Sequence, residues 1–285
     1  MLELLLSPRK AQKHPWEMFL IGIVYASLAV FLVNWIFGSD AVLVKYSGIL
    51  IVTFTVMFSL PFVYYSIKNE EERDIKYEGF FRIYKEHSRA LLSLMWLFLG
   101  FVVAFSFWYI MLHSNYNFKA QIEVFCQINQ PGNVEGCVSQ YQTIGFVKTT
   151  GFMTAKAKLL AIFSNNIYVL IFTLVFSLIF GAGAIFILAW NASVIAAAIG
   201  IFSKSDLASL PLGLARYLIH GVPEIAAYFI GALAGGIVSI AVIRHEIKSE
   251  KFWSVLQDSL NLVIVEVIIL FLASLIEVFV TPILF

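Results

Sequence analysis

The chain has 285 residues, of which 60% are hydrophobic and only 13% are charged, and its mean hydropathy is +0.87. A surface of that composition excludes a soluble globular domain and is typical of a polytopic membrane protein. A formal net charge of +1 without a basic patch excludes nucleic acid as a partner. The composition predicts an all-α transmembrane helical bundle whose first partner is the lipid bilayer.

Five apolar runs are long enough to cross the bilayer, at 18–37, 46–66, 90–112, 221–243 and 260–281. The segment 1–17 is not a signal peptide, because its apolar part, Leu2 to Leu6, is short and no small-residue cleavage site follows the later apolar run. We therefore expect the first run to act as an uncleaved signal anchor, and each of the five runs to form one transmembrane helix.

A sixth run, Ile167 to Phe202, has 36 residues without a charge. It can be interpreted in two ways. It predicts either two short spans that turn near Gly181 or a re-entrant half-helix broken at Asn191. If the N-terminus is inside, 12 of the 19 Lys and Arg fall in the inner segments 1–17, 67–89 and 244–258. That bias follows the positive-inside rule and requires two crossings within the run. We predict about seven spans, with the N-terminus inside and the C-terminus outside.

The two cysteines of the chain, Cys126 and Cys137, both lie in the long loop 113–165, which this topology places outside. Ten residues separate them, and Pro131 to Asn133 supply a turn between them. In an oxidising exterior this placement favours a disulfide, the alternative being two free thiols.

Polar side chains stand near the outer ends of two later spans and near the middle of the span between them. Asn165 and Asn166 precede one span, Asn191 lies near the middle of the next, and His220 and Glu224 precede the one after. Buried polar groups in lipid must satisfy one another or line a wet cavity. We therefore expect these five residues to form an intramembrane polar cluster.

Glu224 opens a stretch, 225–243, that has no other charge, and a carboxylate in that position is a functional candidate. The structural alternative is that the asparagines cap helix ends and that Glu224, behind Pro223, complements the positive end of its helix. Small residues that let helices approach closely recur every four residues on the same helix face, at Ala227, Gly231, Gly235 and Ser239. We expect this face to pack against protein rather than lipid.

Glu266 and Glu277 lie eleven residues apart in the last span, nearly on one helical face. Two acids on one stripe of a transmembrane helix indicate a polar lumen or a path for protons or cations. The alternative is that Glu277 is merely interfacial.

His220 and Glu224 are four residues apart, a spacing that offers two metal ligands on one helix face. The sequence has no second His or Cys cluster, no HExxH, no glycine-flanked nucleophile serine and no phosphate loop. We therefore expect no metal, no cofactor and no catalytic residue. An intramembrane metal-dependent hydrolase is the weakest of three functional hypotheses.

The pattern over 160–245 is Asn165-Asn166 opening a span, a glycine bend, Asn191, and then His220-Gly-x-x-Glu224 before a glycine-rich span. This pattern resembles the stage II sporulation protein M family. Ala192 departs from the family, whose members usually have glycine after that asparagine. The resemblance implies a five-span core at 90–285, which includes the loop 113–165. Residues 1–89 would form an N-terminal two-span unit with a charged cytoplasmic connector.

In sporulating bacteria the family member is a membrane scaffold for cell-wall-degrading enzymes, and relatives occur in prokaryotes that never sporulate. The resemblance implies a multi-pass protein of a prokaryotic cell membrane that organises envelope or membrane partner proteins and performs no chemistry of its own. A homo-oligomer is compatible with that role. The alternative from the residues is a cation channel or transporter that uses the intramembrane Asn and Glu side chains.

Overall fold

The computed structural model describes residues 14–74, 80–112, 117–130, 132–142, 154–180, 184–203, 206–243 and 250–285. Within these ranges every regular element is a helix and no strand is present. Seven helices of the described part are long and apolar enough to cross a membrane. The predicted all-α bundle of seven spans is therefore confirmed.

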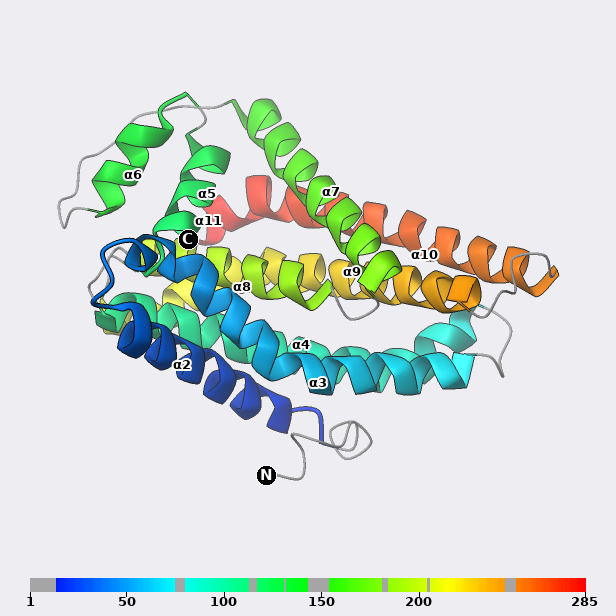
Figure 1. The fold of residues 1–285 in the computed structure, drawn as a ribbon. Helices are drawn as coiled ribbons and strands as arrows, with labels where there is room; N and C mark the ends of the chain where they lie inside the picture. The colour runs from blue at the N-terminus through cyan, green and yellow to red at the C-terminus, as the bar shows by residue number, and fades with distance from the viewer. Residues whose placement is uncertain are drawn as a thin grey trace.

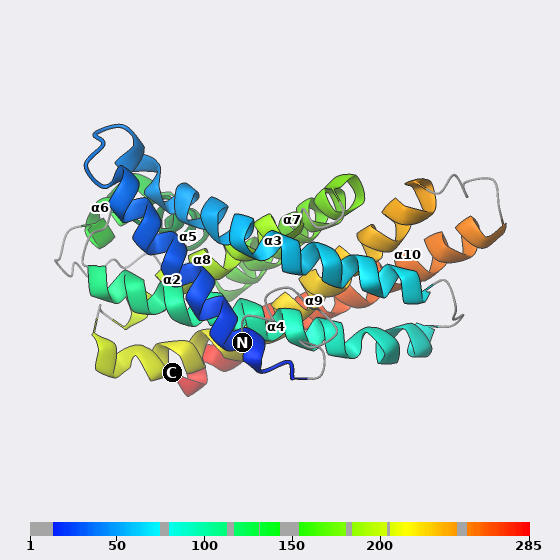
Figure 2. The ribbon, with the colours of Figure 1, turned by 60° about the horizontal axis from the view of Figure 1, so that its bottom comes forward.

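The spans are built from α2 (Glu17–Phe37), α3 (Ser47–Asp74), α4 (Phe80–Leu112), α7 (Ala155–Phe180), α8 (Ala184–Phe202), α9 (Leu210–Ile243) and α10 (Glu250–Leu275). A π-helix, η4 (Ile276–Val280), and the short α11 (Thr281–Leu284) continue α10. Two further helices, α5 (Lys119–Asn129) and α6 (Val134–Gln142), lie at one end of the bundle (Figure 1). We call this end the α5–α6 end. Helices α3, α4, α9 and α10 extend furthest toward the opposite end (Figures 1 and 2).

The charge-free run 167–202 forms two helices, α7 and α8, and Asn191 lies inside α8 without breaking it. The two-span interpretation is therefore correct. The turn itself, 181–183, lies outside the described residues.

Several helices are longer than the apolar runs that predicted them. Helix α9 begins at Leu210, so Pro223 lies well inside it, and α7 begins at Ala155, so Asn165 and Asn166 are interior too. The interpretation of these residues as helix-end groups is therefore wrong. Hydropathy detects the part of a helix that lies in lipid, whereas good helix formers carry the helix further, and an internal proline is tolerated in membrane helices.

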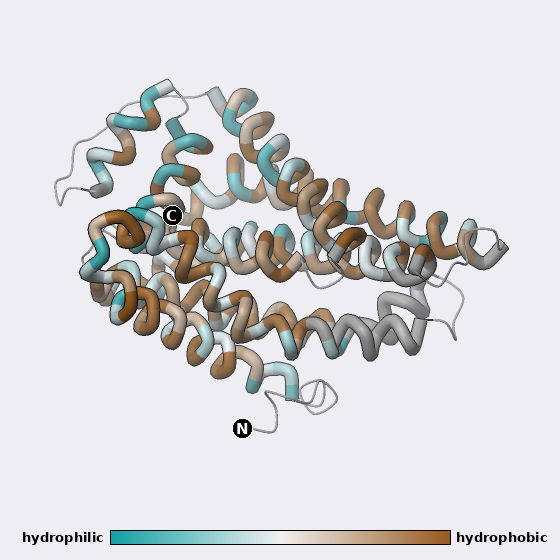
Figure 3. The backbone as a smooth tube through the Cα atoms, viewed as in Figure 1, coloured by the Kyte–Doolittle hydropathy of each residue, from teal (hydrophilic) through white to brown (hydrophobic). Residues whose placement is uncertain are grey.

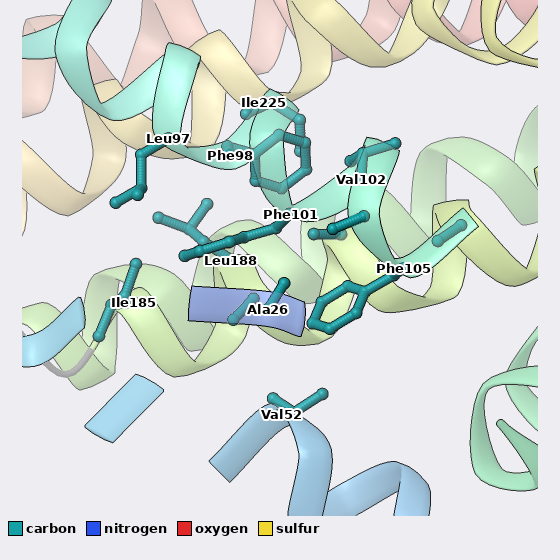
Figure 4. Close-up of a cluster of buried hydrophobic side chains, with 14 of the residues drawn as sticks. Ala26, Val52, Leu97, Phe98, Phe101, Val102, Phe105, Ile185, Leu188 and Ile225 are labelled. Atoms are coloured by element: carbon teal, nitrogen blue, oxygen red, sulfur yellow. The ribbon is translucent and has the colours of Figure 1, made fainter. Parts of the chain in front are cut away.

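Helix α4 lies between α2, α8 and α9 and carries much of the buried core. A Cβ on its Gly100 would lie 2.9 Å from the Cα of Gly22 in α2, so only glycines allow the two helices this approach. Figure 4 shows its buried side chains with those of α8 and α9, among them Leu97, Phe98, Phe101, Leu188 and Ile225. The division of the chain at residue 89 stays a prediction. Residues 75–79 of its charged connector lie outside the described part.

Helices α5 and α6 form a compact hairpin, joined by the disulfide between Cys126 and Cys137. Both cysteines are buried with Ile122 and Val138, and Tyr109 of α4 packs against them. The buried Gln121 of α5 donates from Nε2 to the carbonyl of Gly48 at 3.0 Å and to Ser193 Oγ at 3.1 Å. Hydrophilic residues are frequent on this hairpin, in contrast to the spans (Figure 3). The bonds of Gln121 hold the hairpin on the first turn of α3 and on the middle of α8.

Candidate functional site

Helices α7 and α9 both start at the α5–α6 end and run side by side in the same direction (Figure 1). Asn166 of α7 donates from Nδ2 to Glu224 Oε1 of α9 at 2.8 Å, across a separation of 58 residues. Further along, Ser177 Oγ donates to the carbonyl of Ala232. Both members of the Asn166–Glu224 pair are buried, so the carboxyl group of Glu224 faces protein rather than lipid.

A cavity of about 630 Å³ lies among α5, α7, α8, α9 and the C-terminal residues. The structure places all five members of the predicted polar cluster on its wall, namely Asn165, Asn166, Asn191, His220 and Glu224. Asn191 also donates from Nδ2 to the carbonyl of Ile187 in its own helix, at 2.8 Å. The bundle therefore brings together polar side chains that are up to 59 residues apart in the chain.

His220 connects α9 to the C-terminal segment. Its Nε2 lies 3.9 Å from Glu277 Oε2, and its Nδ1 lies 3.3 Å from Thr281 Oγ1. Glu277 is in the π-helix η4, where the wider turn changes the direction of the side chains. Glu277 and Thr281 both line the cavity.

Glu266 lies in a different environment from Glu277. It is fully buried, neither of its carboxyl oxygens has a hydrogen-bond partner in the described residues, and it does not line the cavity. A Cβ on Gly231 would lie 3.0 Å from both oxygens, so this glycine makes room for the carboxyl group. The structure thus places the two acids of the predicted stripe in separate surroundings.

The small residues of α9 are all buried at the contacts with neighbouring helices. A Cβ on Gly235 would lie 2.9 Å from the carbonyl oxygen of Leu174 in α7, and one on Gly231 would meet Leu170 as well as Glu266. Ala227 and Ser239, the ends of the small-residue face, are 0% and 6% exposed. This face lies against α7 and α10. Figure 2 shows α9 running beside α10.

Two basic residues of the cavity wall, Lys158 and Arg216, were absent from the predicted site. They are partly buried, and they have the same 58-residue separation as Asn166 and Glu224. Arg216 Cζ lies 4.7 Å above the ring of Phe202. No carboxylate of the described residues lies within ion-pair distance of either basic group. Lys158 and Arg216 are as far apart in the sequence as Asn166 and Glu224. Because α7 and α9 pack in parallel, this equal separation places Lys158 and Arg216 at the same depth in the bundle.

The cavity combines hydrogen-bonding groups and two cationic groups with walls of apolar and aromatic side chains. Within the described residues, no group of three or more His, Cys, Asp and Glu side chains is arranged to hold a metal ion. The polar groups of the cavity wall can recognise a ligand by charge and by hydrogen bonds.

The profile of the family described as "Stage II sporulation protein M" matches residues 27–282, which include all of the cavity-lining helices. The chain belongs to this family. It is also 33% identical over 127 residues to an uncharacterized protein of Methanocaldococcus jannaschii, a stretch that covers 43% of this chain and 70% of that protein. No solved structure matches the chain. Together with its seven apolar helices, membership of this family identifies a multi-pass membrane protein.

Proposed function

We propose that the protein is a scaffold in the cell membrane of a prokaryote, and that the α5–α6 hairpin docks the extracytoplasmic domain of an envelope partner. The proposal rests on two restraints that order this hairpin. The disulfide joins its two helices to each other, and Gln121 binds the hairpin to the spans. A surface that is already ordered loses less conformational entropy when a partner binds. No chemistry of the protein's own is required for this role.

The partner side of the hairpin is polar and charged. Lys119 and Glu123 form an ion pair of 3.8 Å, and their side chains are 40% and 49% exposed. Glu135 and Ser139 of α6 are exposed as well. Charges at the rim of an interface set specificity and the rate of encounter. We therefore infer a partner with a complementary, mixed-charge surface.

The experiment is quantitative recovery of partners with the tagged full-length protein from its native membrane. We expect the triple variant Lys119→Glu, Glu123→Lys and Glu135→Lys to lose most of the partner that the wild type recovers. The matched control is Lys45→Glu, an exposed charge that precedes α3. Equal recovery by the wild type and the triple variant would refute docking through this hairpin.

Cation passage is the second candidate, because Glu224 and Glu277 line the same cavity. If this candidate is correct, cation flux into proteoliposomes falls in Glu224→Gln. The control is Glu266→Gln, because Glu266 lies outside the cavity, and its flux should match the wild type. Flux equal to that of protein-free liposomes would end this candidate, and the scaffold would stand without it.

A further inference from the structure

The two basic residues of the cavity wall stand at the same level of their parallel helices, near the α5–α6 end. Lys158 and Arg216 each stand eight residues before the Asn166–Glu224 pair on their own helix, which corresponds to about 12 Å along a helix axis. Each is partly buried, and within the described residues neither forms a close ion pair, although the carboxyl group of Glu277 interacts with both from a longer distance. Two cations that share a single carboxyl group leave one positive charge for an anionic ligand, and a guanidinium and an ammonium group suit phosphate.

The carboxyl groups of the cavity already have partners. Glu224 accepts from Asn166, and Glu277 lies beside His220. An anion therefore has its favourable position between Lys158 and Arg216, nearer the α5–α6 end than Glu224.

The remaining wall is apolar and reaches the lipid-facing surface. It is formed mainly by α7 and α8, with the side chains of Phe172, Phe176, Phe186, Ile187, Trp190 and Val194. At its rim Tyr168, Phe172 and Ile49 are 64%, 54% and 41% exposed although they line the cavity. Since exposed apolar residues of a transmembrane helix face lipid, the cavity is open to the bilayer at this rim.

We propose that the cavity binds a lipid with an anionic phosphate headgroup. The headgroup lies between Lys158 and Arg216, and the upper part of the chains lies along α7 and α8. A volume of about 630 Å³ is within the range of ligand pockets and holds a headgroup with the first carbons of its chains. The rest of the chains stays in the bilayer beyond the rim. Basic pockets between transmembrane helices are known to hold lipid headgroups.

Quenching of Trp190 fluorescence by brominated lipid measures occupancy of this wall directly. The full-length protein is placed in phosphatidylcholine nanodiscs that contain increasing fractions of dibrominated phosphatidylglycerol or dibrominated phosphatidylcholine. The Trp190 signal is the difference between the wild type and Trp190→Phe. We expect the anionic lipid to quench Trp190 at a mole fraction about tenfold lower than phosphatidylcholine does.

Charge variants show whether the two basic residues cause this preference. We expect the variant Lys158→Gln with Arg216→Gln to lose it, and Lys156→Gln, an exposed lysine of α7 outside the cavity, to keep it. If the double variant does not fold, the two single variants carry the same test, each with a partial loss. Equal quenching by both lipids, or a preference that survives removal of both charges, would overturn the proposal. Displacement by millimolar inorganic phosphate would assign the site to a free anion and overturn the lipid ligand.

Discussion

Asn166 of α7 donates a buried hydrogen bond of 2.8 Å to Glu224 of α9, and this contact fixes the register of two helices that run in the same direction. The register carries Lys158 to the level of Arg216 at one end of the cavity. Further along, it brings Ser177 to Ala232. The part of the polar wall that α7 and α9 supply therefore follows from a single parallel pairing of helices.

Removal of the amide partner of Glu224 should destabilise the protein. We expect Asn166→Leu to cost about 1–3 kcal/mol, because the buried carboxyl group loses its hydrogen-bond donor. Asn165→Leu is the control, since Asn165 lines the same cavity without a hydrogen bond to the described residues. Thermal unfolding in detergent compares the two variants. Identical transition temperatures would show that the Asn166–Glu224 bond contributes nothing to stability.

The glycines of α9 should differ in their tolerance of alanine. At Gly231 a Cβ would lie 2.9 Å from Leu170 Cδ1 and 3.0 Å from the oxygens of Glu266, whereas at Gly221 it would meet only Ile195, at 4.0 Å. Overpacking costs about 1–3 kcal/mol, while alanine in a helix gains about 0.5–1 kcal/mol over glycine. We expect Gly231→Ala to unfold at a lower temperature than the wild type and Gly221→Ala to match or exceed it. The reverse order would contradict the packing of α9 on α10.

The disulfide should be present in protein isolated from the membrane. Peptide mapping by mass spectrometry without reduction is expected to recover Cys126 and Cys137 in one linked species. Replacement of both by serine should weaken the hairpin by about 2–4 kcal/mol. Recovery of both cysteines as free thiols under non-reducing conditions would contradict the bridge.

Loss of Gln121 should loosen the hairpin without unfolding the spans. Gln121→Leu removes two hydrogen bonds, to Gly48 and to Ser193, which lie in α3 and α8. We expect faster amide hydrogen exchange across α5 and α6 and little change in α4. Gln127→Leu is the control, because Gln127 lies exposed on the same helix. Equal exchange in the two variants would mean that Gln121 does not hold the hairpin.

The number of spans could be predicted from the sequence because hydropathy and the charge bias both depend on the bilayer itself. The polar cluster could be predicted too, since Asn166, Asn191 and Glu224 are costly in lipid unless they meet. Both predictions needed no knowledge of which helices touch.

The rest of the site depends on helix neighbours, which a single sequence does not reveal. Lys158 and Arg216 lie outside the apolar runs, so hydropathy assigns them to loops. In the structure they lie within α7 and α9, because both helices are longer than those runs. Glu277 lies in the π-helix η4, an element that hydropathy does not reveal and that follows the α-helix holding Glu266. Both misses come from helix geometry rather than from the chemistry of the residues.

Crosslinking mass spectrometry of the full-length protein in its native membrane tests the scaffold role most directly, because Lys119 places a reactive amine on the hairpin. We expect links from Lys119 to the extracytoplasmic domain of another envelope protein, and their loss in the variant Glu123→Lys with Glu135→Lys, which keeps Lys119, but not in Lys45→Glu. Links only within the chain or between its copies would contradict the scaffold.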